Sequence, residues 1–195
     1  MSTVESQQPL EPSLEVLTSE RGRCVFYAYK NITVAVWTGQ AEENAARATE
    51  RAARAMVARH SAGRSFVAFV LDGLPGPTPE ATRVFTEAMG SREGLAHVAY
   101  VLEGSGFWAS GLRGMINNAH RESGAKARLL VATTIEDVAA WLAPRHEQAT
   151  GVAVSEEELR SVLANARALG GLAGSAQAVW ARRPGASARV ASDPG

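Results

Sequence analysis

The sequence is poor in cysteine, carries no net charge and contains no long apolar run. Its single cysteine, Cys24, excludes an internal disulfide and any zinc site built from several thiolates. Twenty Lys and Arg residues balance twenty Asp and Glu residues, which argues against the strongly basic face of a nucleic-acid-binding protein. No apolar run reaches the roughly 18 residues of a membrane-spanning helix, and we recognise no signal peptide. We therefore expect a cytoplasmic protein with no nucleic-acid partner and no membrane span.

Motifs for catalysis and metal binding are also missing. The chain contains four histidines, His60, His97, His120 and His146. None forms an i,i+4 pair or has a carboxylate at ligand spacing, so no metal site is predicted. There is no Gly-x-Ser-x-Gly elbow, and Cys24 lies inside a predicted strand, where we expect a buried, inert thiol. Asp72 follows a central strand but forms no general acid–base pair alone. These absences argue against an enzyme.

What the sequence does contain is an alternation of strand-like and helix-like segments, in a length of 195 residues that suits one domain-sized core. Residues 24–29 and 32–38 are rich in β-branched and aromatic residues, and the Lys30-Asn31 pair between them predicts a tight antiparallel hairpin. Further strands are expected at 15–18, 65–71, 96–102 and 128–132, and helices at 41–60, 78–89, 107–120 and 135–142. This order predicts an α/β fold with a mixed, mostly parallel sheet and right-handed crossovers.

The chain divides into five predicted parts. Residues 1–12 are polar and should be a disordered leader, and residues 13–145 form the α/β domain. Because Pro144 is expected to stop the preceding helix, residues 146–154 are interpreted as a linker. A capping box that begins at Ser155 predicts an amphipathic helix over 155–170, and residues 171–195 are predicted to be a flexible tail.

The low lysine content and the abundance of alanine and arginine are typical of a protein from a GC-rich bacterial genome.

Three short motifs carry a resemblance to a known fold family. They are Trp37-Thr38-Gly39, Gly104-Ser105-Gly106-Phe107 and the segment 132–142 (ATTIEDVAAWL). With the order of elements over 14–144, they resemble the STAS domain of anti-sigma-factor antagonists. They are more closely similar to small bacterial STAS-like proteins that are distantly related to lipid-transfer modules. The resemblance implies a STAS-like fold and a regulatory role through protein–protein contact.

The same resemblance directs attention to Thr78. In the antagonists, a phosphorylatable Ser or Thr opens the helix after the second βα strand, close behind an aspartate. Here Asp72 stands at the aspartate position, residues 73–77 (GLPGP) replace the short turn, and Thr78 is the nearest hydroxyl at a helix start. The changed loop favours Thr78 as a plain N-cap over a phosphorylation site, although a phosphate would be stabilised at a helix N-terminus.

A second candidate site lies where residues 104–108 connect a strand to a helix. Backbone N–H groups at such a turn can hold an anion, and Arg113 lies farther along the same helix. The glycine spacing matches neither a dinucleotide fingerprint nor a P-loop, so a structural turn capped by Ser105 is the simpler interpretation. The candidate ligand-binding residues are Asp72, Thr78, Ser105, Gly106 and Arg113, for which a bound nucleotide or flavin is conceivable but not predicted.

The predicted hairpin is apolar on both faces, whereas an exposed antiparallel hairpin normally has one polar face. The C-terminal helix, a second copy of the protein or a ligand must cover the second face. We expect contacts through Tyr27, Tyr29, Trp37, Leu159, Val162, Leu163 and Leu169. Since flexible glycines follow the helix, docking on a neighbouring copy is slightly favoured, giving a homodimer.

Two functional hypotheses follow from these patterns. The first is a non-enzymatic, STAS-like regulatory or scaffold protein that acts through protein–protein contact. The alternative is a small-ligand-binding protein that holds a nucleotide, flavin or lipid at its strand-end loops.

Overall fold

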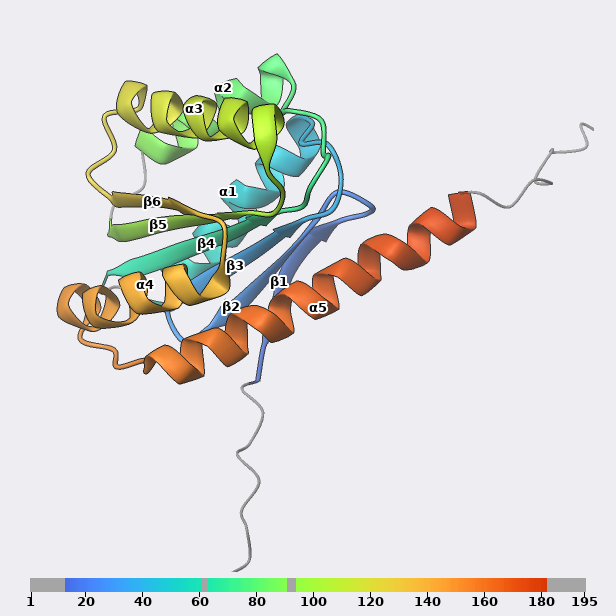
Figure 1. Cartoon of the computed structure of the whole chain (residues 1–195). Coiled ribbons are helices and arrows are strands. Elements are labelled where there is room, and N and C mark those ends of the chain that lie inside the picture. The colour runs from blue at the N-terminus through green and yellow to red at the C-terminus, as the bar shows by residue number, and fades with distance from the viewer. Residues whose placement is uncertain (1–12, 61–62, 91–93, 182–195) are drawn as a thin grey trace, which may run out of the picture.

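The computed structural model describes residues 13–60, 63–90 and 94–181; the predicted leader (1–12) and the end of the predicted tail (182–195) lie outside them. Over these residues, one six-stranded sheet is covered by helices on both faces (Figure 1), which confirms the predicted α/β class. The strands are β1 (Glu15–Glu20), β2 (Cys24–Tyr29), β3 (Ile32–Trp37), β4 (Arg64–Val70), β5 (Leu95–Leu102) and β6 (Arg128–Ala132). The helices are α1 (Glu43–Arg59), α2 (Pro79–Gly90), α3 (Gly106–Glu122), α4 (Ile135–Thr150) and α5 (Glu156–Ala181).

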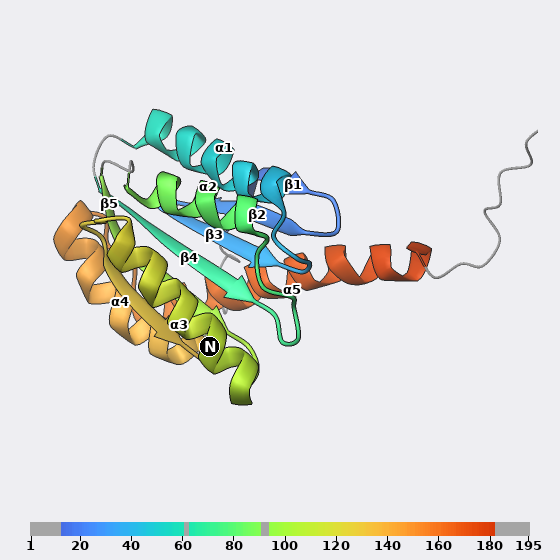
Figure 2. The ribbon, with the colours of Figure 1, turned by 90° about the horizontal axis from the view of Figure 1, so that it is seen from above.

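The strands lie side by side in chain order, β1-β2-β3-β4-β5-β6. β1, β2 and β3 pair antiparallel, whereas β3 to β6 pair parallel, so the predicted hairpin opens a mostly parallel sheet. Since the parallel strands are added in one direction, right-handed crossovers place α1, α2 and α3 on the same face. The opposite face is left for α4 and α5, as Figures 1 and 2 show.

Each face of the sheet carries its own hydrophobic core. On the α1–α3 face, Phe26 and Trp37 of the hairpin pack with Phe66 and the alanines of α1. On the α4–α5 face, Val34 and Val36 pack with side chains of both C-terminal helices. Every residue of β3 is buried, so both faces of this hairpin strand are covered, as its apolar sequence requires.

Helix α4 does not stop at Pro144, contrary to the prediction, but continues to Thr150. Proline removes one backbone N–H and frees the carbonyl one turn earlier, here that of Ala140. Pro144 and Ala140 are both exposed, so water can satisfy that carbonyl, while the buried His146 and Thr150 anchor the helix beyond it. The helix ends at Gly151, whose left-handed φ of 71° suits glycine. The predicted linker over 146–154 is therefore half helix.

Helix α5 begins at the predicted capping box. The Glu158 backbone N–H donates to Ser155 Oγ at 3.0 Å, and the Ser155 N–H donates to the Glu158 carboxylate at 3.2 Å. The helix then continues through Gly170 and Gly171 to Ala181, so the predicted end at residue 170, and with it the start of the flexible tail, is wrong. In Figure 1 its C-terminal end projects beyond the sheet.

The first half of α5 packs on its own chain, so the preferred docking on a neighbouring copy is not what the structure shows. Leu159, Val162 and Leu163 are fully buried, and Leu159 and Leu163 belong to the core on the α4–α5 face. Glu158 accepts a hydrogen bond from the Tyr29 hydroxyl and forms an ion pair with Lys30 at 2.7 Å. The second face of the hairpin is therefore covered in cis, which was one of the three predicted covers.

Candidate ligand-binding pocket

Helix α3 buries few of its side chains against the sheet. Of its residues, all of which are described, only Ala109 is buried. Its apolar side chains recur at the spacing of one helix face, i, i+3, i+4 and i+7, which normally produces a buried stripe. They are Leu112, Met115, Ile116 and Ala119. All four instead line a cavity beneath the helix.

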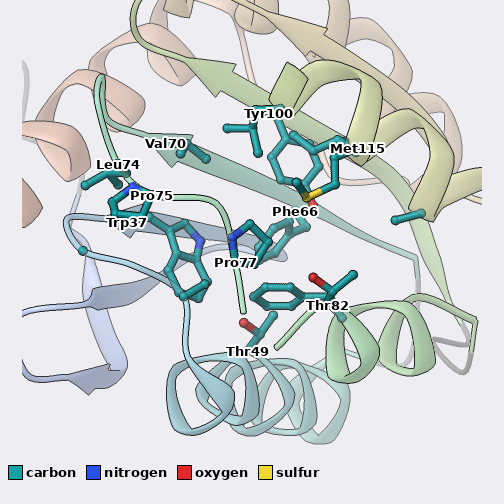
Figure 3. A pocket seen from close by; sticks show the side chains of 16 residues that line it. Trp37, Thr49, Phe66, Val70, Leu74, Pro75, Pro77, Thr82, Tyr100 and Met115 are labelled. Carbon is teal, nitrogen blue, oxygen red and sulfur yellow. The ribbon is translucent and has the colours of Figure 1, made fainter. Parts of the chain in front are cut away.

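The cavity has a volume of about 110 Å³ and lies between α3, α2, α1 and the carboxyl half of the sheet. Its floor consists of alternate, same-facing side chains of the central strands, among them Trp37, Phe66, Val70 and Tyr100. Figure 3 shows these side chains gathered around one space. No charged side chain occurs among the described residues that line it.

An aromatic cluster holds one wall of the pocket in place. The Trp37 ring packs edge-to-face on Phe85 of α2, with centroids 5.6 Å apart and an interplanar angle of 88°. On its other side, Trp37 meets Phe26 at 5.9 Å and 84°. Edge-to-face pairs of this kind stabilise fixed ring positions. The pocket therefore combines a rigid aromatic wall with a loosely packed helix.

The loop between β4 and α2 closes one side of the pocket with Leu74, Pro75 and Pro77. Two side chains from outside the loop donate hydrogen bonds to its backbone carbonyls. The Trp108 indole N–H donates to the Leu74 carbonyl at 2.6 Å, and the Gln40 side-chain amide donates to the Gly76 carbonyl at 3.0 Å. Residues 73–77 are the proline-rich segment that replaces the short turn of the anti-sigma-factor antagonists. In this protein they form one wall of the pocket.

Thr78 caps helix α2, as predicted. Its Oγ1 accepts a hydrogen bond from the Ala81 backbone N–H at 3.2 Å. The Thr78 hydroxyl therefore acts as an N-cap, which is the role that the sequence favoured over that of a phosphorylation site.

The remaining strand-end residues surround the start of α3 rather than the pocket. Ser105 holds the N-cap position of α3, but its side chain makes no capping hydrogen bond, contrary to the predicted cap. Ser105 and Gly106 are exposed, and the Asp72 carboxylate lies against Gly104. A carboxylate beside this turn opposes an anionic ligand. Arg113 lies two turns along α3, with its Nε buried and unpartnered among the described residues.

The residues predicted to form a contact surface are mostly interior. Tyr27 and Tyr29 pack with Leu159 and Leu163 on the α4–α5 face, whereas Trp37 lies on the opposite face and lines the pocket. Leu169 of α5 is the exception, because the residue is 45% exposed. The predicted surface is thus divided between two cores.

Sequence reasoning missed a buried polar network at the amino ends of the parallel strands. Asn31 Nδ2 donates to the Gly63 carbonyl at 2.8 Å, which turns Asn31 Oδ1 toward His146 Nε2 at 2.7 Å. His146 therefore carries its proton on Nε2, and its Nδ1 accepts from the Ser65 hydroxyl at 2.8 Å. His97 Nδ1 lies 3.5 Å from the same hydroxyl.

This network joins a serine, a histidine and an amide, but its burial argues for a structural role. Ser65 is 1% exposed and His146 is 0% exposed. A neighbouring cavity of about 20 Å³ leaves room for about one water molecule and not for a substrate. Burial, with smaller contributions from His97 and Lys30, lowers the pKa of His146 to about 4, so the ring is neutral near pH 7. The network fastens α4 to β3 and β4.

Other candidate chemistry is limited in the described part of the chain. Burial raises the pKa of the Cys24 thiol to about 12, as suits the predicted inert cysteine. Among the described residues, no group of three or more His, Cys, Asp or Glu side chains is placed to hold a metal ion. None of the described helices combines the length and the apolar character that crossing a membrane requires.

No protein-family model matches the chain, and no curated protein is detectably similar to it. The STAS-like resemblance therefore stays a prediction that rests on the three motifs and the order of elements.

Proposed function

We propose that this protein binds a small, largely apolar molecule in the pocket beneath α3. The observation that carries the proposal is the cavity of about 110 Å³ whose described lining includes no charged side chain. Concave, mostly apolar pockets with few polar groups are typical of small-molecule sites. The apolar stripe of α3 faces this space instead of packing on the sheet, as a helix over a ligand would.

The size of the pocket restricts the ligand. An engineered apolar cavity of about 150 Å³ binds benzene, and this space of about 110 Å³ is smaller, so it takes a short alkyl chain or most of one ring. A larger molecule has to extend out of the pocket. A nucleotide is the poorest fit of the predicted ligands, because its phosphates require positive charge and Asp72 lies at the turn before α3.

The protein–protein contact expected from the sequence is less well supported than ligand binding. The aromatic hairpin face that suggested it is covered by α5 of the same chain. A STAS-like regulatory role stays compatible with the pocket if the ligand is the regulating signal, and the exposed Leu169 is the predicted contact residue that a partner could still reach.

Binding can be tested with p-xylene as the probe, by following backbone amide chemical shifts during a titration. We expect saturable shifts at residues of α3 and the β4–α2 loop. The variant Ala119→Leu places a larger side chain in the pocket. It should weaken p-xylene binding by roughly 10-fold or more, because the probe then loses its apolar contacts with the pocket walls. Asn117→Leu, at an exposed position of the same helix, is the matched control and should bind normally. No saturable shift in the wild type, or equal binding by Ala119→Leu, would contradict the proposal.

A further inference from the structure

Thr49 is the one lining residue of the pocket whose polar atom is buried without a hydrogen-bond partner among the described residues. It lies in the middle of α1 and is 4% exposed. Figure 3 shows its side chain at the pocket, across from Thr82. A buried hydroxyl without a partner is unfavourable, and such groups in native structures call for an explanation.

The threonines of α2 show what a helical hydroxyl ordinarily does. Thr82 Oγ1 donates to the Thr78 carbonyl at 3.0 Å, and Thr86 Oγ1 donates to the Thr82 carbonyl at 3.0 Å. Both thereby bond to the carbonyl one turn earlier, the usual partner of threonine in a helix. Thr82 also lines the pocket, but the proton of its hydroxyl is already donated to the Thr78 carbonyl. Among these described threonines, only Thr49 therefore has a hydroxyl proton left to donate to a ligand.

We propose that Thr49 donates a hydrogen bond to a single acceptor atom of the ligand, so that the pocket selects an uncharged molecule with an apolar ring and one hydroxyl or carbonyl oxygen. This inference rests on the proposed binding function. The absence of charged side chains from the described lining disfavours a carboxylate or an amine, which would lose its hydration without gaining a counter-ion. The rings of Trp37, Phe66 and Tyr100 supply flat apolar walls that suit an aromatic body.

The test compares p-cresol with p-xylene, two probes of nearly equal shape in which a hydroxyl replaces one methyl group. The measured quantity is the ratio of the two dissociation constants, because it cancels the shared apolar contacts. Thr49→Val removes the hydroxyl and keeps the branched shape. It should lower the preference for p-cresol by about 3- to 10-fold, the size of one net hydrogen bond. Thr49→Ser, which keeps the hydroxyl, should retain most of the preference.

Thr82→Val is the matched control, because the Thr82 hydroxyl lines the same pocket but has no proton left to donate beyond the one it gives the Thr78 carbonyl. Its p-cresol to p-xylene ratio should equal that of the wild type. If both probes bind and Thr49→Val leaves the ratio unchanged, the inference fails while the binding function stands. In that case the hydroxyl is satisfied elsewhere, for example by a water molecule in the small cavity that Thr49 also borders. If neither probe binds to the wild type, the proposed function fails, and this inference fails with it.

Discussion

The backbone of Gly170 on α5 passes so close to Val36 on β3 that a Cβ atom at position 170 would lie 2.6 Å from the Val36 Cβ. Both residues are fully buried, and the contact lies well beyond the capping box that starts the helix. Glycine at position 170 thus serves close packing of helix on sheet, since no other residue leaves this space empty.

The first prediction concerns this contact. Gly170→Ala should lower the free energy of unfolding by about 1–3 kcal/mol, because the added methyl group overpacks the interface by more than alanine's helix propensity offsets. Gly171→Ala is the neighbouring control: its methyl group would meet only the guanidinium of Arg167, which pairs with Glu103, so a loss of less than about 1 kcal/mol is expected. Urea unfolding curves of both variants measure the difference. Equal stability of the two would show that α5 does not pack on β3 as described.

The second prediction concerns the buried histidine. An unfolded histidine titrates near 6.5, whereas burial lowers the pKa of His146 in the folded protein to about 4. Between these values the unfolded state binds a proton that the folded state does not. Stability is therefore fully present above about pH 6.5 and falls as the pH decreases, by roughly 1.4 kcal/mol per unit, or about 2 kcal/mol at pH 5. Burial also lowers the pKa of His97, which steepens the same fall.

Urea unfolding at about pH 7 and about pH 5 tests this linkage. His146→Gln should be less stable at the higher pH, because it disrupts the bonds to Ser65 and Asn31, but its stability should depend less on pH. His60→Gln, at the end of α1, is the control. If His146→Gln loses as much stability on acidification as the wild type, another group is responsible.

The third prediction concerns the loop over the pocket. Trp108→Phe keeps an aromatic ring but removes the indole N–H that donates to the Leu74 carbonyl at 2.6 Å. We expect a loss of about 0.5–1.5 kcal/mol in the free energy of unfolding, the usual net value of one hydrogen bond. Phe107, its neighbour, is 95% exposed, so Phe107→Ser should change stability by less than about 0.5 kcal/mol. A Trp108→Phe variant as stable as the wild type would show that this bond does not hold the loop.

Much of the fold could be predicted, because it is encoded over short stretches. Strand and helix periods, the Lys30-Asn31 turn and the caps at Thr78 and Ser155 involve residues close in sequence. The errors occurred where distant packing overrides a local signal. Pro144 is a valid stop signal, but its exposed position leaves the helix free to continue to the buried Thr150. Gly170 looked like a helix end, because the sequence cannot show that Val36 lies against it.

The candidate site could not be predicted for the same reason. Its lining comes from three helices, three strands and the connecting loops, and the side chains of α3 look like an ordinary core stripe in the sequence. The partners of His146 in the polar network lie 81 and 115 residues away. The available signals were indirect: the two prolines of the β4–α2 loop, and the glycines inside an otherwise regular α3.

The last prediction uses those glycines. Gly111 and Gly114 lie inside α3, and a Cβ atom at either position would meet nothing within 4 Å. Glycine weakens a helix interior by about 0.5–1 kcal/mol relative to alanine, so Gly111→Ala and Gly114→Ala together should raise the free energy of unfolding by about 1–2 kcal/mol. If ligand enters by local opening of α3, the same change should slow exchange of p-xylene several-fold with little effect on its affinity. Gly106→Ala is the contrasting variant, because its left-handed φ of 79° disfavours alanine, and it should destabilise the protein. Urea unfolding and NMR exchange spectroscopy measure the two quantities. A double variant that is more stable but exchanges p-xylene at the wild-type rate would show that the ligand enters without opening α3.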